Sequence, residues 1–249
     1  MPLSWDFSIF ECLPSTQDLL KEKAQEGAME GLVIQAASQT KGRGRQGREW
    51  HSQEGNLYLS FLLKPNCSVQ DIGQISLLIG WALGRSISEF IQKPESLSLK
   101  WPNDLLLEGR KCAGILLESS LDCTGRIEWL AVGLGVNVSA VPEKMSGNIG
   151  ASLNDYATQP IDLALFRESL FIHLEACYTL WQEQGFAPIR EGWLAMAHDF
   201  GAPVTVKITP QDIRSGAFEG VDGRGALLIR TDKKEAVETI TAGDVYLCF

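Results

Sequence analysis

The sequence predicts an α+β protein made of a large domain and a small one. Over the first 200 residues, stretches typical of strands alternate with stretches typical of helices, which is the pattern of a mixed sheet covered by helices. From Gly201 onward, short β-type runs follow one another without a helix between them, and this predicts a small antiparallel barrel. We therefore expect a large domain over residues 1–200 and a C-terminal domain over residues 201–249.

The first helix should begin at Ser15, because Asp18 follows three residues later as in a capping box, and it should end near Gly27. Elsewhere, β-branched and aromatic runs predict strands, and longer apolar stretches predict helices. In chain order, the expected elements of the large domain are strands at 32–37 and 56–64, a helix at 71–91, a strand at 97–101, a hairpin at 105–118, a strand at 127–138, and helices at 162–184 and 188–198. Those of the small domain are strands at 204–208, 214–221, 226–231 and 238–246. Residues 141–150 have the composition of a mobile loop.

Composition and charge favour a soluble enzyme. The chain has 249 residues, of which 45% are apolar and 21% charged, so it can bury a large core. No apolar run reaches the length that spans a membrane, and the N-terminus lacks the basic flank of a signal peptide, so we expect a cytoplasmic protein. The net charge of −9 disfavours a general nucleic-acid binder, which needs a broad basic face.

The positions of cysteine and histidine argue against a structural zinc site. The six cysteines, at positions 12, 67, 112, 123, 177 and 248, form no C-x-x-C pair and no cluster with the three histidines. We interpret them as reduced thiols. His51 follows Trp50 directly and is interpreted as a structural histidine, with contact to a nucleotide as the alternative.

A basic, glycine-rich segment at residues 39–50, QTKGRGRQGREW, is the most informative part of the chain. It contains four cationic side chains and three glycines just before an apolar strand. Glycines let main-chain N–H groups approach phosphate oxygens, and arginines offer forked donors for phosphate or carboxylate. The segment therefore indicates an anion site, although a solvated basic loop or a nucleic-acid contact would have the same composition.

Two further segments contain candidate functional residues. Lys100-Trp101-Pro102-Asn103-Asp104 precedes Arg110-Lys111-Cys112-Ala113-Gly114, so that the Asp104 carboxylate and Lys111 lie seven residues apart across a Glu108-Gly109 turn. In a hairpin, both side chains can face one pocket. Residues 132–138, VGLGVNV, form an apolar run with two glycines, which indicates that a group packs flat against this strand.

These segments, in this order and spacing, resemble the biotin protein ligases, whose marks are GRGRxGRxW, KWPND, RKxAG and GxGxN. The resemblance runs from about Ser15 to the C-terminus, where residues 220–227 and 242–245 look like the end domain of the family. It implies a mixed sheet like that of class II aminoacyl-tRNA synthetases, followed by an SH3-like β-barrel. Since the Ser-Thr pair of the motif stands at 15 and 16, we expect a short form that lacks the N-terminal DNA-binding domain.

The resemblance also implies a reaction. Such ligases use ATP and Mg²⁺ to activate biotin as biotinyl-5'-AMP, and then transfer biotin to a lysine of a biotin carrier domain, such as that of acetyl-CoA carboxylase. Family members often dimerise through the sheet, so a homodimer is expected. No nucleic-acid or membrane partner is expected.

Site residues are carried over motif by motif. The expected catalytic residues are Lys111, Arg43 and Asp104, with Asp104 either holding Mg²⁺ or orienting Lys111. The residues expected on biotin are Ser15, Thr16, Gln39, Gly42, Arg43, Arg45, Lys111, Gly114, Gly133 and Gly135. Those expected on ATP or the adenylate are Arg43, Arg45, Arg48, Trp50, Asn103, Lys111 and Asn137.

Each assignment has a structural alternative. Ser15 can be a plain helix cap, Trp50 a core tryptophan, and the glycines packing positions within strands. Lys111 is expected at an edge, where it would contribute little burial. The chain also departs from the family at Gln17, where asparagine is usual after the Ser-Thr pair.

Three rival functions stay open. A lipoate or octanoate ligase shares the fold and the adenylate chemistry, but should have a different glycine-rich motif. A nucleic-acid-binding module would use the basic loop on phosphates. A catalytically inactive scaffold would keep the fold without the reaction, which intact Lys111 and Asp104 disfavour.

Overall fold

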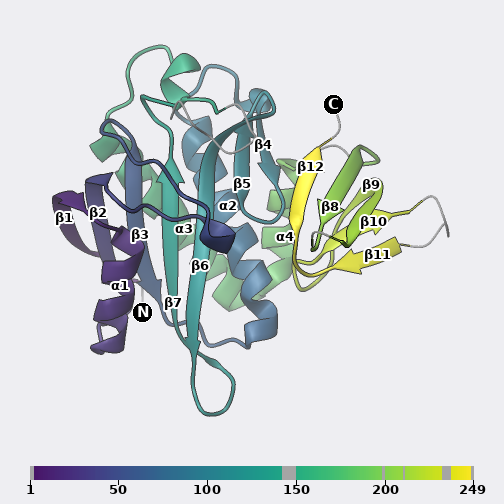
Figure 1. Cartoon of the computed structure of the whole chain (residues 1–249), viewed down its shortest axis with the longest axis horizontal. Coiled ribbons are helices and arrows are strands. Elements are labelled where there is room, and N and C mark those ends of the chain that lie inside the picture. The colour runs from purple at the N-terminus through teal and green to yellow at the C-terminus, as the bar shows by residue number, and fades with distance from the viewer. Residues whose placement is uncertain (1–2, 142–149, 198–199, 210, 232–236, 248–249) are drawn as a thin grey trace.

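The structure is a computed structural model that describes residues 3–141, 150–197, 200–209, 211–231 and 237–247. It contains a large mixed sheet with helices on both faces and a smaller antiparallel sheet beside it (Figure 1). The predicted α+β fold class is therefore confirmed. Most of the expected 141–150 loop, residues 142–149, lies outside the described residues.

The large sheet has seven strands in the order β1-β2-β3-β7-β6-β5-β4. Their bounds are β1 Asp6–Leu13, β2 Leu32–Gln39, β3 Leu57–Leu63, β4 Leu97–Lys100, β5 Asp104–Leu107, β6 Arg110–Leu121 and β7 Ile127–Val136. β1 and β2 pair in parallel, and the other neighbours pair antiparallel. The edge strand β1 was not expected from the sequence, and none of its residues is buried.

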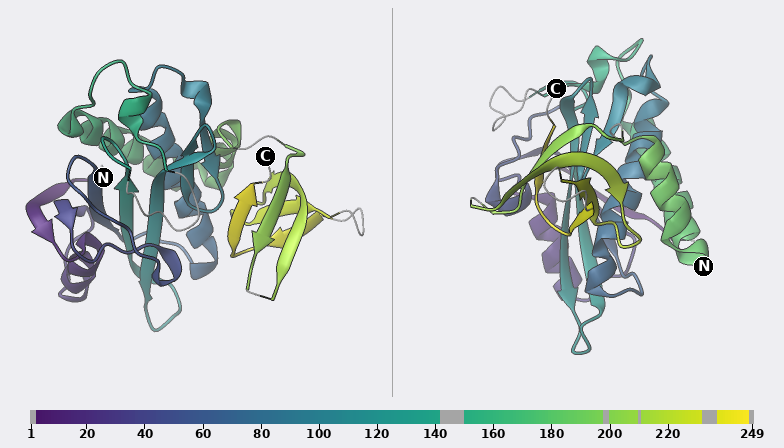
Figure 2. Two further views of the ribbon diagram at one scale, coloured as in Figure 1. Left: turned by 45° about the horizontal axis from the view of Figure 1, so that its top comes forward. Right: turned by 90° about the vertical axis from the view of Figure 1, so that its right-hand side faces the viewer.

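Helices cover the two faces of this sheet unequally (Figure 2). Val33 and Phe61 point into the main core with α2 (Ile72–Ser88) and α3 (Leu163–Gln184), whereas the adjacent Ile34 and Leu62 pack in a smaller cluster with α1 (Thr16–Gln25). Because successive strand residues face opposite sides, α1 lies on the face opposite α2 and α3. This leaves part of the α1 face uncovered by helices.

The first helix begins as expected at Ser15, whose Oγ accepts a hydrogen bond from the Asp18 backbone N–H at 3.3 Å. Only half of the capping box forms, because the Asp18 carboxylate binds Arg43 instead of reaching back to the cap. The other helices match their predictions closely; the last of them is α4, Phe186–Ala195.

The smaller sheet has five strands in the order β11-β10-β9-β8-β12. Their bounds are β8 Pro203–Lys207, β9 Ile213–Val221, β10 Leu227–Arg230, β11 Val237–Ile240 and β12 Asp244–Leu247. The single strand expected over 238–246 was wrong. The chain turns at Gly243, where φ is +156°, and β11 and β12 pair at opposite edges of the sheet. Glycine adopts this backbone conformation at no steric cost.

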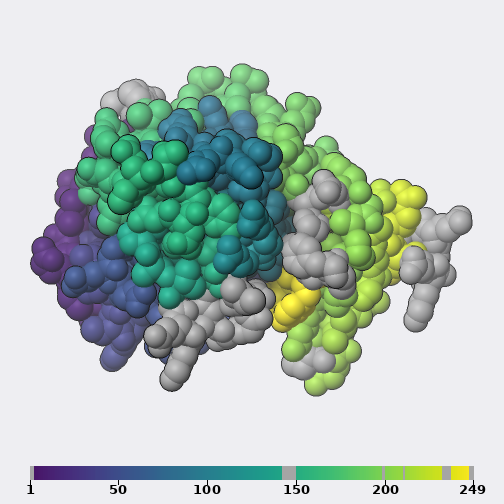
Figure 3. Space-filling model, turned by 90° about the horizontal axis from the view of Figure 1, so that it is seen from above, coloured from purple at the N-terminus to yellow at the C-terminus, as the bar shows by residue number. Residues whose placement is uncertain are grey.

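The two sheets are in direct contact, although the space-filling view shows the smaller one as a lobe beside the main body (Figure 3). Trp101 Nε1 donates to the Gly225 carbonyl at 2.9 Å, and Arg190 Nε donates to the Val221 carbonyl at 2.5 Å. Gly73 and Gly225 approach so closely that a Cβ on Gly225 would lie 2.9 Å from the Gly73 carbonyl carbon. These contacts fix the small sheet against α2 and α4.

The cysteines of the described ranges carry free thiols: Cys12 and Cys123 are exposed, and Cys67, Cys112 and Cys177 are buried. Burial raises the pKa of the Cys67 thiol to about 11 and that of Cys112 to about 12, so both stay protonated near neutral pH. Among the described helices, none is long and apolar enough to cross a membrane.

Candidate active site

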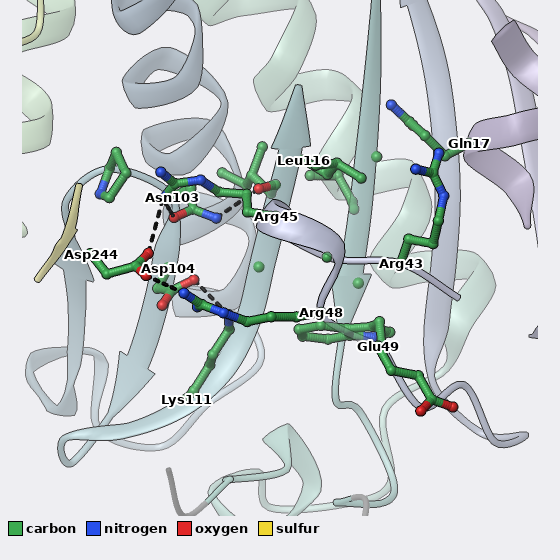
Figure 4. Close-up of a pocket in the computed structure, with 18 of the residues that line it drawn as sticks. Gln17, Arg43, Arg45, Arg48, Glu49, Asn103, Asp104, Lys111, Leu116 and Asp244 are labelled. Atoms are coloured by element: carbon green, nitrogen blue, oxygen red, sulfur yellow. Dashed lines mark hydrogen bonds and ion pairs between the residues drawn. The ribbon is translucent and has the colours of Figure 1, made fainter. Parts of the chain in front are cut away.

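A cavity of about 470 Å³ lies on the face of the large sheet that carries α1, beyond the end of that helix (Figure 4). On this face, small residues replace the apolar ones that pack beneath α1: Ser60 precedes Leu62 on β3, and Gly133 and Gly135 follow Ala131 on β7. Gly114 on β6 completes the floor. The alternation of residues along the strands thus leaves a hollow where the helix ends.

The floor glycines make room for two side chains. A Cβ at Gly135 would lie 2.5 Å from the Trp50 ring, and a Cβ at Gly114 would lie 3.2 Å from it. At Gly133, the corresponding contact is Gln17 Oε1 at 2.8 Å. The flat group expected against this strand is therefore the Trp50 indole, whose buried Nε1 has no hydrogen-bond partner.

One end of the cavity is a network of neutral hydrogen-bonding groups. Thr16 donates to Gln39 Oε1 from its backbone N at 2.8 Å and from Oγ1 at 3.1 Å, and Thr16 Oγ1 lies 2.9 Å from Ser60 Oγ. Gln39 Nε2 donates to Ser52 Oγ at 2.8 Å. Ser60 was missed by the sequence reasoning, although a serine in the otherwise apolar or aromatic strand LYLSFLL is a visible signal.

The other end of the cavity carries charge. The β5–β6 hairpin turns at Glu108 and Gly109, both with positive φ, and brings Lys111 Nζ to 2.6 Å from Asp104 Oδ1. Lys100 Nζ lies 3.4 Å from Asp104 Oδ2. Burial alone would raise the pKa of Asp104, but the two lysines outweigh it and hold that pKa below its usual value. Asp104 is therefore ionised at neutral pH.

Lys111 differs from its prediction in one respect. It lies on β6, between β5 and β7, and its side chain is only 17% exposed, so it is not an edge residue with little burial. Its ammonium group lies 5.2 Å from the centre of the Trp50 ring, within cation–π range. The lysine is thus held from two sides, by a carboxylate and by an aromatic face.

The basic loop crosses in front of the cavity and its arginines diverge (Figure 4). Arg43 turns toward α1 and β6, where it binds Asp18 at 2.5 Å and Glu118 at 3.2 Å. Arg45 and Arg48 turn the other way, toward Asp244 on β12. Arg43 is therefore not brought together with Lys111, whereas Arg45 and Arg48 lie on the same side as the Lys111–Asp104 pair.

Arg45 is the more deeply placed of these two arginines. Its Nη1 donates to Asn103 Oδ1 at 2.8 Å and its Nη2 to the Gly243 carbonyl at 3.3 Å. Burial lowers the pKa of Arg45, and the nearby carboxylates of Asp244 and Asp104 act against this. The Arg45 side chain thus links the loop, the Asn103 segment and the smaller sheet.

The remaining predicted site residues fall into two groups. Asn137 lines the cavity, is 1% exposed, and has a buried Oδ1 without a hydrogen-bond partner. Ser15 also lines the cavity, while its Oγ caps α1. Gly42 does not line it: a Cβ there would lie 2.3 Å from the Trp50 carbonyl oxygen, so this glycine serves the close approach of the loop to itself. His51 lines the rim, with Nδ1 3.5 Å from a Glu49 carboxylate oxygen.

The smaller sheet contributes residues that the sequence reasoning did not assign to the site. These are Lys207, Asp244, Val245 and Tyr246. The segment at 242–245 had been recognised as a motif of the end domain, but its distance in sequence from the loop gave no sign of contact. The site is therefore built by both sheets.

Comparisons with known proteins identify the family to which this chain belongs. Residues 9–137 match the model of the biotin/lipoate A/B protein ligase family, and residues 199–247 match that of the biotin protein ligase C-terminal domain. The chain belongs to the biotin/lipoate A/B protein ligase family. The site residues described above all fall within these two matched regions.

Individual members of this family are similar over nearly the whole chain. The bifunctional ligase/repressor BirA of Bacillus subtilis is 33% identical over 241 residues, covering 95% of this chain and 72% of that protein. The biotin–[acetyl-CoA-carboxylase] ligase of Paracoccus denitrificans is 36% identical over 218 residues, covering 84% and 88%. Among solved structures, the biotin protein ligase from Aquifex aeolicus in complex with biotin and ATP has a TM-score of 0.83 at 27% identity, covering 98% of this chain and 99% of that one.

Proposed function

We propose that this protein is an ATP-dependent biotin protein ligase. It converts biotin and ATP to biotinyl-5'-AMP and pyrophosphate, and then transfers the biotinyl group to the ε-amine of a lysine in a biotin carrier domain. One observation carries the proposal: a single cavity joins a neutral hydrogen-bonding end to a charged end with the Lys111–Asp104 pair. The Paracoccus denitrificans relative is named a biotin–[acetyl-CoA-carboxylase] ligase, and the similar Aquifex aeolicus structure is a biotin protein ligase in complex with biotin and ATP.

The charged end suits the first half-reaction. The biotin carboxylate must attack the α-phosphate of ATP, so two anions have to approach each other, and fixed positive charge lowers that barrier. Lys111 lies beside the cavity floor and is oriented by Asp104 and Trp50. Arg45 and Arg48 lie on the same side of the cavity as Lys111, and both pair with Asp244. Their guanidinium groups can bind the pyrophosphate that leaves, if its phosphates replace Asp244 as the anionic partner.

The neutral end favours biotin over lipoate. The ureido ring of biotin has a carbonyl acceptor and two N–H donors, and it requires a site with both kinds of partner. Ser15, Thr16 and Gln39 offer hydroxyl and amide groups there. The dithiolane ring of lipoate has neither a carbonyl nor an N–H group, so it can form none of these hydrogen bonds.

Asp104 fits a positioning role better than a metal site. Both of its carboxylate oxygens face lysine ammonium groups. Mg²⁺ commonly binds substrate phosphates and keeps several waters, so we propose that it enters with ATP, as part of the MgATP substrate.

The finer features of the proposal concern partners and setting. The partner is a biotin carboxyl carrier protein or a similar domain, and no nucleic acid is proposed, since the loop arginines pair with carboxylates and the net charge is −9. We place the reaction in the cytoplasm, where ATP is available and free thiols persist. We also propose a homodimer through the large sheet, whose edge strand β1 exposes Ile9 by 58%.

The test combines the protein with biotin, MgATP and an isolated carrier domain. We expect the carrier to gain the mass of one biotinyl group, and we expect pyrophosphate release to require biotin. A carrier in which the acceptor lysine is replaced by arginine is the control. Attachment of lipoate or octanoate in place of biotin would contradict the proposal.

A further inference from the structure

Asn56 is a buried asparagine to which the proposed reaction has given no part. It stands one residue before β3 and is 2% exposed. Asn137 stands one residue after β7. Leu57 and Val136 form the pair at this end of the β3–β7 ladder, so Asn56 and Asn137 lie next to the same pair, where the two strands end.

The amide of Asn56 holds the segment that follows Asn137. Its Oδ1 accepts hydrogen bonds from three consecutive backbone N–H groups, those of Val138, Ser139 and Ala140, at 2.8, 2.9 and 3.1 Å. Its Nδ2 donates to the Ala140 carbonyl at 2.9 Å. One side chain thus takes over from the strand ladder that has just ended, and it fixes the path of the chain there.

The turn that carries Asn56 is fixed in its own right. Asn56 Nδ2 also donates to the Tyr58 hydroxyl at 3.0 Å, and this hydroxyl donates to the Gln53 carbonyl at 2.9 Å. Gly55 lies so close to the held segment that a Cβ on it would be 3.1 Å from Ser139 Cβ. Asn56 therefore ties the residues after β7 to a rigid anchor.

Asn137 depends on this anchor for the direction of its side chain. Its backbone N–H donates to the Cys112 carbonyl and its carbonyl accepts from the Leu153 N–H, both at 2.8 Å. Its side chain, which lines the cavity, makes one long hydrogen bond, from Nδ2 to the Lys111 carbonyl at 3.4 Å. The backbone that enters and leaves Asn137 therefore sets where its amide points, and Asn56 holds the leaving side.

The neutral end of the cavity does not use this anchor. Thr16, Gln39 and Ser60 form hydrogen bonds with one another, and Gln39 also donates to Ser52. Asn56 itself is not one of the residues that line the cavity. A change at Asn56 should therefore reach the nucleotide through Asn137 and leave biotin binding as it is.

We propose that Asn56 is a positioning residue for the nucleotide: its amide holds residues 138–140 and so orients Asn137 toward ATP. This inference rests on the proposed function and on the expected contact between Asn137 and ATP. Asn56 acts at a distance from the substrate, through one side chain that touches it.

The experiment is a double-mutant cycle on Asn56 and Asn137, with biotin-dependent pyrophosphate release as the assay. Asn137→Ala should raise the KM for ATP by about 10- to 100-fold, the effect of losing hydrogen bonds to a buried ligand. Asn56→Ala should raise it by about 5- to 50-fold. Biotin affinity, measured by isothermal titration calorimetry, should stay within about twofold of that of the parent in both variants.

The double variant decides the route of the effect. In the Asn137→Ala background, Asn56→Ala should change the KM for ATP by about twofold or less, because the side chain through which it acts is gone. The melting temperature should fall in both backgrounds, since the three N–H groups lose their acceptor in each. A loss of stability and a loss of positioning thus give different patterns.

Two further variants complete the set. Asn66→Ala changes an exposed asparagine beyond the other end of β3, which accepts a hydrogen bond from Arg126, and it should keep the KM for ATP. If Asn56→Ala does not fold, as judged by its melting curve, Asn56→Asp carries the same cycle. It keeps an acceptor for the three N–H groups and loses the donor to Ala140 and Tyr58.

The possible failures are distinguishable. Equal effects of Asn56→Ala in both backgrounds, or a loss of biotin affinity as large as the rise in the KM for ATP, would show that Asn56 only supports the fold. An unchanged KM in Asn137→Ala would remove the route. Each of these results would overturn the inference while the ligase function stands. A parent protein that releases no pyrophosphate with biotin and MgATP would overturn the proposed function and, with it, the role of Asn56.

Discussion

The Lys111–Asp104 pair links the proposed catalytic role of the lysine to the stability of the fold. The carboxylate is 14% exposed and the lysine 17%, and Lys111 Nζ lies 2.6 Å from Asp104 Oδ1. Removing one partner of a buried ion pair leaves an uncompensated charge, which is strongly destabilising. Substitutions here should therefore be measured for both turnover and folding.

Lys111→Ala should lower the rate of adenylate formation by about 10²- to 10³-fold, the effect of losing one preorganised electrostatic donor. It should also lower the melting temperature, because Asp104 keeps only the more distant Lys100 at 3.4 Å. Biotin-dependent pyrophosphate release measures the first effect, and thermal unfolding the second. Lys93→Ala, at an exposed position, is the control. A Lys111→Ala protein with a nearly normal rate would indicate that Arg45 and Arg48, and not Lys111, stabilise the negative charge of the reacting phosphates.

Asp104 should also give the protein a distinct response to acid. Its folded pKa is depressed below the ordinary value of about 3.9, so the folded state binds fewer protons than the unfolded state as pH falls. The stabilisation is complete above about pH 5 and is lost as pH drops through the folded pKa. We expect the difference in unfolding free energy between the parent and Asp104→Asn to shrink below about pH 4.

Urea titrations at a series of pH values test this expectation. Asp6→Asn, at an exposed carboxylate on β1, controls for the change in net charge. A stability difference that stays constant down to acid pH would show that the folded pKa of Asp104 is not depressed.

At the scale of elements, the basic loop is tied at both ends by carboxylates. Arg43 binds Asp18 and Glu118 on one side, and Arg48 binds Asp244 on the other. The glycines and cations of the loop still predict that biotin and ATP slow its motion, because anionic ligands then supply the countercharge. Asp244 would hold one end of the loop until phosphates take its place.

Asp244→Asn should therefore increase amide hydrogen exchange at residues 41–48 in the absence of ligands, because Arg48 loses its ionic partner. Biotin with ATP should restore protection in both proteins. Asp212→Asn removes a carboxylate that binds Arg214 within the same small sheet, and serves as the matched control. Identical exchange with and without ligands, in parent and variant, would contradict the expectation.

The hairpin that joins Asp104 to Lys111 was predictable, because a Glu-Gly turn between apolar runs fixes the register locally. The directions of Arg43 and Arg48 were not predictable, because they depend on carboxylates that lie 25 and 196 positions away in the chain. The same limit applies to β12, whose pairing with β8 splits the strand expected at 238–246.

The residues of the candidate site also divide into those that could be predicted from the sequence and those that could not. Motif residues such as Thr16, Gln39 and Asn137 line one cavity, and the order of the motifs was enough to group them. Ser60 and Lys207 carry no motif and enter the cavity only through sheet pairing and the contact between the sheets. Gly42 belongs to a motif, yet it packs against the Trp50 carbonyl within the loop. The motif alone does not show whether a glycine makes room for a ligand or for the loop.

At the scale of the whole molecule, the two sheets share one hydrophobic core. Val206 and Phe218 of the small sheet belong to the same buried cluster as Ile79 of α2 and Trp193 of α4. The division at residue 200 stays a prediction about the chain, but it does not separate two independent cores. Packing of this kind favours unfolding as a unit.

We therefore expect a single cooperative transition in urea, with far-UV circular dichroism and tryptophan fluorescence giving the same midpoint. Trp101→Phe should lower the unfolding free energy by about 1–3 kcal/mol, because it leaves the Gly225 carbonyl without its donor. Two separate transitions in the parent protein would show that the small sheet unfolds alone.

The distance in sequence between Asp244 and the basic loop has a consequence for synthesis. Lys100 donates to the Val245 carbonyl, Arg45 to the Gly243 carbonyl, and Arg48 pairs with Asp244, so one wall of the cavity is made from β12. The strands of the large sheet leave the ribosome well before β12 does, so this sheet can form while the wall is still missing. The pocket is therefore completed only once β12 has also emerged and paired with β8.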